Sequence, residues 1–337
     1  MIFSRKNTYN LFNINQYNIK TSKFSHILHD EQESVLEEEF SEYVGAKYAC
    51  VANSASSLLT LCMLAVKEFG AALQNNPISI PSMIPLVVPN ILYNLDLPWK
   101  WKDDVDWIGS SYVLYDSKKI YESTEGASVE NSFKIIDSAQ EVRRDQFKDD
   151  ASSKDLMVFS FYPTKPVGGM DGGIIVSNDK DRIDWFRAAT HLGVVSSRES
   201  SWDRKLDFPG WKMHPNSSQC YVAINNLRKL DKKNKILDGI KDKYNSEFGI
   251  NNTSRHLYRI DVDDRDRFIK KMKRSGIATG IHYSAAHNET AYSEKASVES
   301  PLKNTDTKSK TTVSIPFNEK LKEKDTDFII KKIRENT

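Results

Sequence analysis

The stretch FSFYPTKPVGGMDGG, residues 159–173, contains a single lysine in an otherwise mostly uncharged run. It joins two apolar segments, LMVFSF (156–161) and GGIIVSND (172–179), which are candidate β-strands. Lys165 is an unexpected residue there if solubility is its only purpose. A lysine attacks a carbonyl group only when its amine is neutral, and that requires a lowered pKa. Lys165 is therefore a candidate nucleophile.

Apolar runs and helical patterns alternate along the chain on the N-terminal side of this stretch and just beyond it. Further candidate strands lie at 47–53, 78–82 and 133–139, and candidate helices at 31–45, 54–70 and 181–193. Strands that alternate with helices favour a mostly parallel sheet covered on both faces. The sequence therefore predicts an α/β fold.

The C-terminal part of the chain has a different pattern. Residues 215–248 predict a long charged helix or helix pair, and the strand and helix patterns over 256–283 indicate a smaller α+β domain. We expect a large domain over residues 1–228 and a small one over 229–337. Residues 194–210 have the length of a functional loop, and the polar residues 293–312 predict a surface loop.

The composition excludes several classes of protein. The 337 residues carry a net charge of +2, which gives no overall attraction to nucleic acid or membrane. No apolar run reaches the roughly 20 residues of a membrane-spanning helix. The spacing of Cys50, Cys62 and Cys220 suits neither a zinc site nor a disulfide framework, so we expect no metal and a reducing cytoplasm.

Polar residues at the ends of other candidate strands suggest the chemistry that Lys165 serves. Asp137 ends an apolar strand in IIDSAQ, where a buried carboxylate needs a positive partner such as a protonated pyridine nitrogen. Gln140 lies one helical turn further on, and Ser160 ends the strand before Lys165. In NSASS, Ser56 and nearby backbone N–H groups could hold a phosphate at a helix N-terminus. Together these features describe a site for pyridoxal phosphate (PLP).

Five segments, in this order, resemble the DegT/DnrJ/StrS family of PLP-dependent sugar-nucleotide aminotransferases. They are LEEEFSEYVGAKYACVANSASSL, IIDSAQ, FSFYPTKPVGGMDGGIIVSND, GWKMHPNSSQ and GIATGIHYSAAH. The resemblance implies aminotransferase fold type I, with a mostly parallel seven-stranded sheet flanked by helices and a smaller C-terminal α+β domain.

The resemblance also implies roles for individual residues. Lys165 matches the lysine that forms the internal aldimine and then shuttles a proton, and Asp137 matches the acid that keeps the pyridine nitrogen protonated. Gln140 matches a residue near the ring hydroxyl. The cradle of the phosphate is matched by Ser160, Ala55 and Ser56.

Five more residues stand at positions around the edge of the family's site. Lys212 matches a residue that reaches the phosphate from the partner subunit, which implies a homodimer with active sites at the interface. His282, Tyr283 and His287 match a motif near the substrate. Pro85 stands where the family stacks an aromatic ring on the cofactor, and an apolar contact could replace that stacking.

The function predicted on this basis is transfer of an amino group to a keto group of a nucleotide-linked sugar, with L-glutamate as the expected donor. Two alternatives remain open. One is a catalytically degenerate relative that acts by binding or regulation. Pro85 and a chain shorter than most family members suggest this alternative. The other is a sugar dehydratase of the same family, but those members have histidine in place of the lysine.

Overall fold

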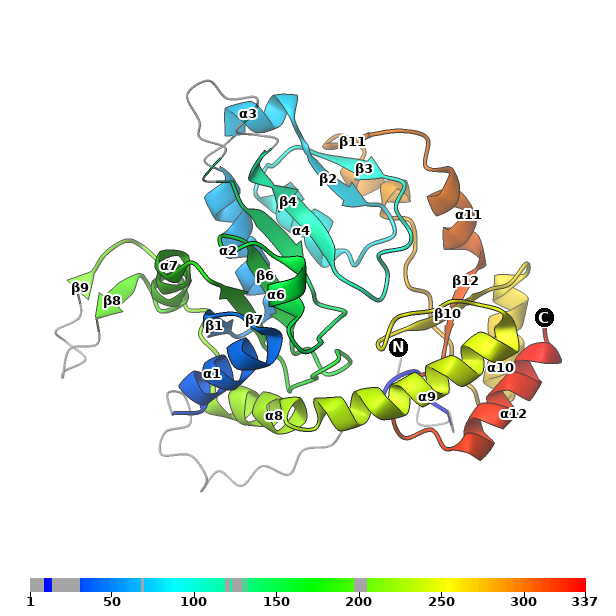
Figure 1. Ribbon diagram of the computed structural model, residues 1–337. Helices are drawn as coiled ribbons and strands as arrows, with labels where there is room; N and C mark the ends of the chain where they lie inside the picture. The colour runs from blue at the N-terminus through cyan, green and yellow to red at the C-terminus, as the bar shows by residue number, and fades with distance from the viewer. Residues whose placement is uncertain are drawn as a thin grey trace.

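A computed structural model describes residues 9–13, 31–67, 70–118, 122, 130, 132–196 and 205–337 of the chain. Its centre is a five-stranded sheet (Figure 1). In spatial order the strands are β1 (Tyr48–Ala52), β7 (Gly173–Ser177), β6 (Leu156–Ser160), β5 (Lys134–Asp137) and β4 (Tyr112–Asp116). Only β5 and β6 pair in parallel, and the other three pairings in this sheet are antiparallel.

Helices cover both faces of this sheet, as the sequence predicts. Successive strand residues point to opposite faces, so Leu156 and Val158 join one apolar cluster while Met157 and Phe159 join another. The first cluster packs against α2 (Ala55–Val66), α4 (Val87–Asn94) and α7 (Lys180–Thr190), and the second against α1 (Gln32–Val44) and α8 (Ser217–Leu227). A sheet buried on both faces explains why its strands are continuous apolar runs.

A second sheet holds three parallel strands, β11 (Ala296–Val298), β3 (Trp99–Lys102) and β2 (Ile78–Pro81). β2 contacts β4 of the first sheet, but no ladder of paired residues joins the two strands. The expected α/β class is confirmed. The expectation of one mostly parallel seven-stranded sheet is wrong in detail, because the strands form two sheets and the larger one is mixed.

Two strands produce the antiparallel pairings of the larger sheet: β7 runs opposite to both of its neighbours, β1 and β6, and the other strand is β4. It runs antiparallel to β5, the next strand along the chain. An antiparallel neighbour can be joined by a simple return, whereas a parallel neighbour needs a crossover of a dozen or more residues. The connection from β4 to β5, residues 117–133, is long enough for such a crossover, so its length does not determine the direction of β4. The connection from β3 to β4, residues 103–111, is shorter.

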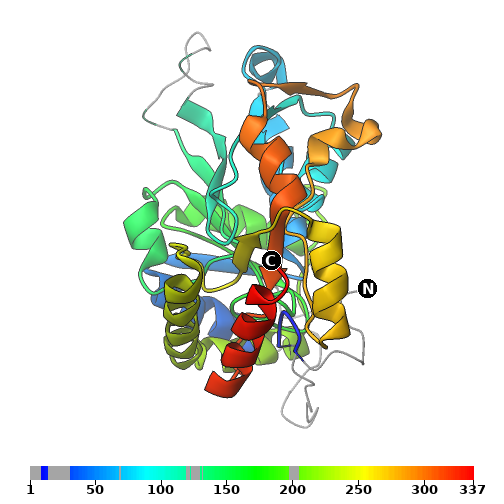
Figure 2. The same ribbon diagram turned by 90° about the vertical axis from the view of Figure 1, so that its right-hand side faces the viewer.

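The C-terminal part begins with α9 (Leu230–Phe248), which continues the path of α8 along the lower side of the molecule in Figure 1. Figure 2 shows α12 (Glu323–Arg334) between α9 and α10 (Arg265–Arg274), and behind them β10 (Tyr258–Asp261) pairs antiparallel with β12 (Thr312–Ile315). A third apolar cluster, drawn from residues 237–333, lies among these elements. The domain boundary at 228/229 stays a prediction.

Two predicted loops contain regular structure. Residues 293–312 hold β11 and a helix, α11 (Lys303–Thr311), so the expected surface loop is wrong there. Within 194–210, β8 (Val194–Ser196) pairs with β9 (Lys205–Leu206), and residues 197–204 lie outside the described part of the chain. The remaining short elements are α3 (Gly70–Asn75), α6 (Gln146–Asp150), η4 (Ala286–Asn288) and η5 (Thr290–Tyr292).

Candidate active site

The register of the five-stranded sheet brings three chain segments to one edge. Ala52 at the end of β1 and Ser160 at the end of β6 both pair with Gly173 of β7. β5 runs parallel to β6 and ends at Asp137 on the same edge. The segments after β1, β5 and β6 therefore start side by side, the usual position of a ligand site in an α/β sheet.

A cavity of about 440 Å³ opens at this edge. Every predicted cofactor residue except Lys212 lines it, namely Ala55, Ser56, Pro85, Asp137, Gln140, Ser160 and Lys165. The other lining residues are Ser54, Leu59, Val87, Trp107, Ser110, Ala139, Tyr162 and Asp171. The structure thus gathers residues from six separate segments of the chain around one space.

Asp137 is a buried carboxylate in the wall of the cavity, with an exposed fraction of 7%. Its Oδ2 accepts a hydrogen bond from the Tyr112 hydroxyl at 3.1 Å, and its Oδ1 accepts one from the Ala139 N–H at 2.9 Å. Both donors are neutral. Burial raises the pKa of Asp137, against the opposing effects of the Ala139 N–H, Lys165 and Tyr112. A cationic group in the cavity would stabilise this carboxylate in its charged form.

Lys165 lies in the turn that follows β6, and its backbone N–H donates to the Tyr162 carbonyl at 2.8 Å. Gly168 closes the turn with φ of 56°, and a Cβ there would lie 3.0 Å from the Pro163 carbonyl oxygen. Burial lowers the pKa of Lys165 to about 8, although Asp137 acts in the opposite direction. A substantial fraction of its amine is therefore neutral at pH 7 to 8.

The N-terminus of α2 forms another part of the wall. Ser54 caps the helix, with its side-chain oxygen accepting from the Ser57 N–H at 3.1 Å. Gly173 lets the helix start this close to the sheet, because a Cβ there would lie 2.3 Å from the Ala55 nitrogen. Ala55 and Ser56, the first two residues of α2, thus present a helix N-terminus to the cavity, where an anion is favoured.

Gln140 and Ser160 are both buried and are held by backbone donors. The Gly109 N–H donates to Gln140 Oε1 at 3.0 Å, and the Tyr162 N–H donates to Ser160 Oγ at 3.2 Å. Pro85 is half-buried at the cavity, whereas its neighbours Met83 and Ile84 point into the apolar core.

Four predicted site residues do not line the cavity. Lys212 is exposed, and its backbone forms an isolated bridge with His191. His282 hydrogen-bonds Ser314 Oγ through Nδ1 at 2.8 Å, and burial lowers its pKa to about 4. Tyr283 stacks in parallel on Trp107, with ring centroids 6.3 Å apart. His287 bonds Ser82 Oγ at 2.7 Å through Nδ1.

Sequence reasoning missed two aromatic residues of this site. Trp107 lines the cavity, and Tyr112 donates to Asp137. Both lie in or next to the short connection between β3 and β4, and a tyrosine at a strand start carries no local signal of its function. Their positions depend on the reversed direction of β4.

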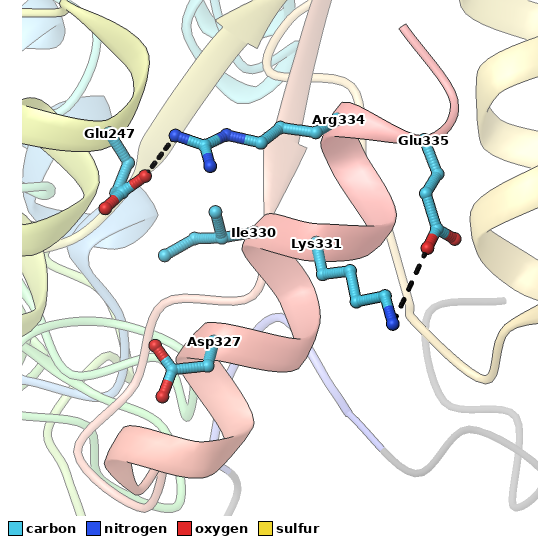
Figure 3. Close-up of a pocket in the computed structure, with 6 residues that line it drawn as sticks. All are labelled: Glu247, Asp327, Ile330, Lys331, Arg334 and Glu335. Atoms are coloured by element: carbon cyan, nitrogen blue, oxygen red, sulfur yellow. Dashed lines mark hydrogen bonds and ion pairs between the residues drawn. The ribbon is translucent and has the colours of Figure 1, made fainter.

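A second hollow, of about 380 Å³, lies between α9 and α12 (Figure 3). Paired charges line it: Arg334 bonds Glu247, and Lys331 lies 3.9 Å from Glu335. None of the predicted site residues is among its lining residues. We interpret it as a charged seam between two packed helices.

The part of the chain that the structure describes contains no group of three His, Cys, Asp or Glu side chains arranged to hold a metal ion. Within the same residues, no helix is both long and apolar enough to cross a membrane.

Comparison with known proteins fits this geometry. Residues 135–334, more than half of the chain, match the model of the DegT/DnrJ/EryC1/StrS aminotransferase family. The chain belongs to this family. The predicted aminotransferase class of enzyme is thereby confirmed, and the family-based resemblance with it.

One curated relative is the UDP-4-amino-4,6-dideoxy-N-acetyl-β-L-altrosamine transaminase of Campylobacter jejuni. It is 28% identical over 96% of this chain and 95% of its own length.

Two solved structures share the fold. The Helicobacter pylori aminotransferase PseC, involved in pseudoaminic acid biosynthesis, matches with a TM-score of 0.73, 16% identity, and coverage of 97% of this chain and 99% of its own. A DegT DnrJ EryC1 StrS aminotransferase from Brucella abortus matches with a TM-score of 0.70, 19% identity, and coverage of 92% and 91%. The predicted aminotransferase fold is confirmed.

Proposed function

We propose that this protein is a PLP-dependent aminotransferase that moves an amino group from an amino acid, L-glutamate in our expectation, to a keto group of a UDP-linked sugar. The observation that carries the proposal is the set Ser56, Asp137, Gln140, Ser160 and Lys165 around one cavity. The sugar class rests on the Campylobacter jejuni relative, which is named for a UDP-linked amino sugar.

The donor set of the cavity fits the cofactor. The start of α2, with Ala55 and Ser56, suits a phosphate, and Ser160 lines the same cavity. Asp137 has only neutral hydrogen-bond donors in the structure, so a protonated ring nitrogen would meet an uncompensated carboxylate. Pro85 offers an apolar surface, and Lys165 offers an amine with a lowered pKa for the aldehyde.

When bound, PLP supplies an aldehyde for amine exchange and a ring that accepts the electron pair left on the reacting carbon. The protein's own part is to hold and move protons. Asp137 keeps the ring nitrogen protonated. Once its amine is free, Lys165 Nζ takes the proton from the α-carbon of the amino donor. In the second half of the reaction it delivers a proton to the sugar carbon that receives the amino group. Water supplies the oxygen of the 2-oxo acid that the donor becomes, and the sugar's keto oxygen leaves as water, so no water is consumed overall.

Surroundings of the cavity support a homodimer. Leu86, Val87, Tyr162 and Met170 are large apolar side chains exposed in or next to the lining segments, and Tyr162 has an exposed fraction of 50%. Such a surface is typical of a contact with another chain. In a dimer, Lys212 of the partner subunit would approach the phosphate.

The substrate side of the proposal involves the segment 282–287. Tyr283 stacks on Trp107 of the cavity wall, and the charge of Lys165 lowers the pKa of His282, so both lie close to the site. We assign His282, Tyr283 and His287 to the neighbourhood of the sugar.

The test is the visible absorption spectrum of the purified protein with added PLP. Binding through Lys165 gives a yellow protein, and L-glutamate should remove the colour. UDP-4-amino-4,6-dideoxy-N-acetyl-β-L-altrosamine should do the same, because it is the amine partner named for the relative. A protein that never takes up PLP would overturn the proposal. A yellow protein insensitive to both amines would keep the cofactor and refute both assigned substrates.

A further inference from the structure

Lys233 is a lysine on the core-facing side of α9. Leu230, Asn234 and Leu237 are buried, and their spacing defines the inward face of this helix. Lys233 lies three residues after Leu230 and four before Leu237, so it stands on the same face. It is half-buried, whereas the adjacent Lys232 is exposed. Lysine is uncommon in such a position because burial disfavours its charge, so the position of Lys233 needs a physical reason.

The amine of Lys233 bonds the turn that carries Lys165. Its Nζ donates to the carbonyl oxygen of Pro166 at 2.7 Å, and Pro166 is the residue directly after Lys165. Burial lowers the pKa of Lys233, and Glu319 acts in the opposite direction. The partner of this partly desolvated amine is thus a neutral backbone carbonyl next to the candidate nucleophile.

A second side chain holds the same turn. Asn226 of α8 donates through Nδ2 to the carbonyl oxygen of Gly168. Pro163 and Pro166 lie on either side of Lys165 and have no backbone N–H with which to bond the rest of the protein. The carbonyl groups that follow Lys165 are bonded instead by side chains of α8 and α9. The two helices therefore fix the turn from outside the sheet.

The place of the turn determines the surroundings of the Lys165 amine. Burial gives this amine its lowered pKa of about 8, although Asp137 acts in the opposite direction. If the turn moved outward, the amine would reach water and its pKa would rise toward the ordinary 10.5. A displacement of about 1 Å at a reacting group can also lower a rate by about 100-fold. Both the reactivity and the aim of Lys165 thus depend on what holds the turn.

We propose that Lys233, assisted by Asn226, is a positioning residue that holds Lys165 in its buried place in the cavity wall. The inference rests on the proposed function, since a fixed position of Lys165 matters only if this amine binds PLP. It explains why the inward face of α9 carries an amine between two leucines. Lys233 acts through the backbone of the turn and does not line the cavity itself.

The first experiment measures Lys165 in the full-length apo-protein, without the cofactor. Trace acetylation with acetic anhydride over a range of pH, followed by mass spectrometry of the peptide containing Lys165, gives its pKa and its reactivity. Lys233→Met keeps a long, helix-compatible side chain and removes the donor. We expect it to raise the pKa of Lys165 from about 8 to roughly 9, and therefore to slow acetylation at pH 7 about tenfold.

Two further variants control this measurement. Lys232→Met removes an exposed lysine from the adjacent position, along the hollow that Lys233 also lines, and should leave the pKa of Lys165 unchanged. Lys233→Arg keeps a donor at the end of a long side chain, so it should restore most of the acetylation rate. A role in helix stability alone would not distinguish Lys233→Met from Lys233→Arg at Lys165.

The second experiment uses the protein loaded with PLP. Lys233→Met should lower kcat about 10-fold, because Lys165 is displaced from the reacting carbon, while KM changes less than twofold. Lys232→Met should turn over like the unmodified protein. A higher KM with an unchanged kcat would contradict a positioning role.

The outcomes separate this inference from the proposed function. If Lys165 keeps its pKa and acetylation rate in Lys233→Met, the inference is wrong and the function stands. An equal change in Lys232→Met would also overturn it, because the effect would then follow from lost surface charge. If the unmodified protein never takes up PLP, both fail. Should Lys233→Met not fold, Lys233→Gln replaces it, since that polar side chain ends one bond short of the lysine amine, and the same two results decide.

Discussion

Asp137 and His287 are both polar side chains in enclosed surroundings, yet their partners differ in kind. Asp137 faces the cavity with two neutral donors and a raised pKa, so its negative charge has no hydrogen-bonded cation in the structure. His287 has a partner at each ring nitrogen: Ser82 Oγ at Nδ1 and, 3.4 Å from Nε2, a carboxylate oxygen of Asp306.

The difference separates groups arranged for a ligand from groups arranged for the fold. The sheet edge holds a carboxylate and a lysine whose charges the protein only partly satisfies. Such groups lower the free energy of unfolding of the protein without ligand, and a ligand that satisfies them raises it again. The segment around His287 instead ties η4 to the residue after β2 and to α11, so its bonds stabilise the protein itself.

The most severe way to test the sheet edge is to remove the lysine. Lys165→Ala should lower amine transfer by at least about 10⁴-fold, because the variant loses both the nucleophile and the proton carrier. It should also lose the visible absorbance that PLP gives the protein. Lys232→Ala is the matched control, since Lys232 is exposed and lies near Lys165 along a neighbouring hollow. Normal turnover by Lys165→Ala would show that the residues at the sheet edge take no part in the reaction.

Asp137→Asn probes the uncompensated charge directly. A carboxamide cannot stabilise a protonated ring nitrogen, so turnover should fall by about 10²- to 10³-fold, as when one member of a buried charge pair is removed. The apo-protein should melt at the same or a higher temperature, because a carboxyl with a raised pKa destabilises the fold once it ionises. A lower melting temperature together with full turnover would show that Asp137 stabilises the fold and takes no part in the reaction.

The pH dependence of cofactor uptake follows from Lys165. Its pKa of about 8 means that the neutral amine becomes about tenfold rarer with each pH unit below 8. The rate of PLP capture by apo-protein should rise about 100-fold from pH 6 to a plateau above 8. Because the folded pKa lies below the ordinary 10.5, this group's contribution to stability increases from pH 8 to 10.5 and is lost as pH falls through 8. Stopped-flow absorbance measures the rate, and a flat profile would refute the neutral-amine requirement.

Residues at strand ends could be predicted because local pattern and sheet geometry determine their positions together. An apolar run followed by a polar residue predicts where β5 and β6 end, and parallel pairing brings both ends to one edge. Asp137, Ser160 and Lys165 were predicted on this basis and do line one cavity. The spacing of NSASS after β1 is equally local, and Ala55 and Ser56 lie at the same cavity.

Other features depend on contacts that no local pattern reveals. The helix α11 lies in a polar segment, and its first turn is capped by Asp103, whose carboxylate accepts from the Asn304 and Thr305 N–H groups about 200 residues away. Trp107 and Tyr112 reach the site because β4 runs antiparallel to β5. In both cases the deciding interaction is long-range, so the sequence pattern favoured a loop or gave no signal.

The smallest expected effect concerns His287. It tests whether the groups around His287 differ in purpose from those around Asp137. His287→Ala removes the bond to Ser82 and the contact with Asp306, which should lower the melting temperature of the 337-residue chain by roughly 1–2 °C for a loss of about 1 kcal/mol. Ser82→Ala should reproduce most of that shift, since it removes the same hydrogen bond. PLP affinity should change less than twofold in both variants, because neither residue lines the cavity. If His287→Ala instead melts normally and raises the KM for the UDP-linked sugar tenfold, His287 contacts substrate, and the two regions form one site when it is occupied.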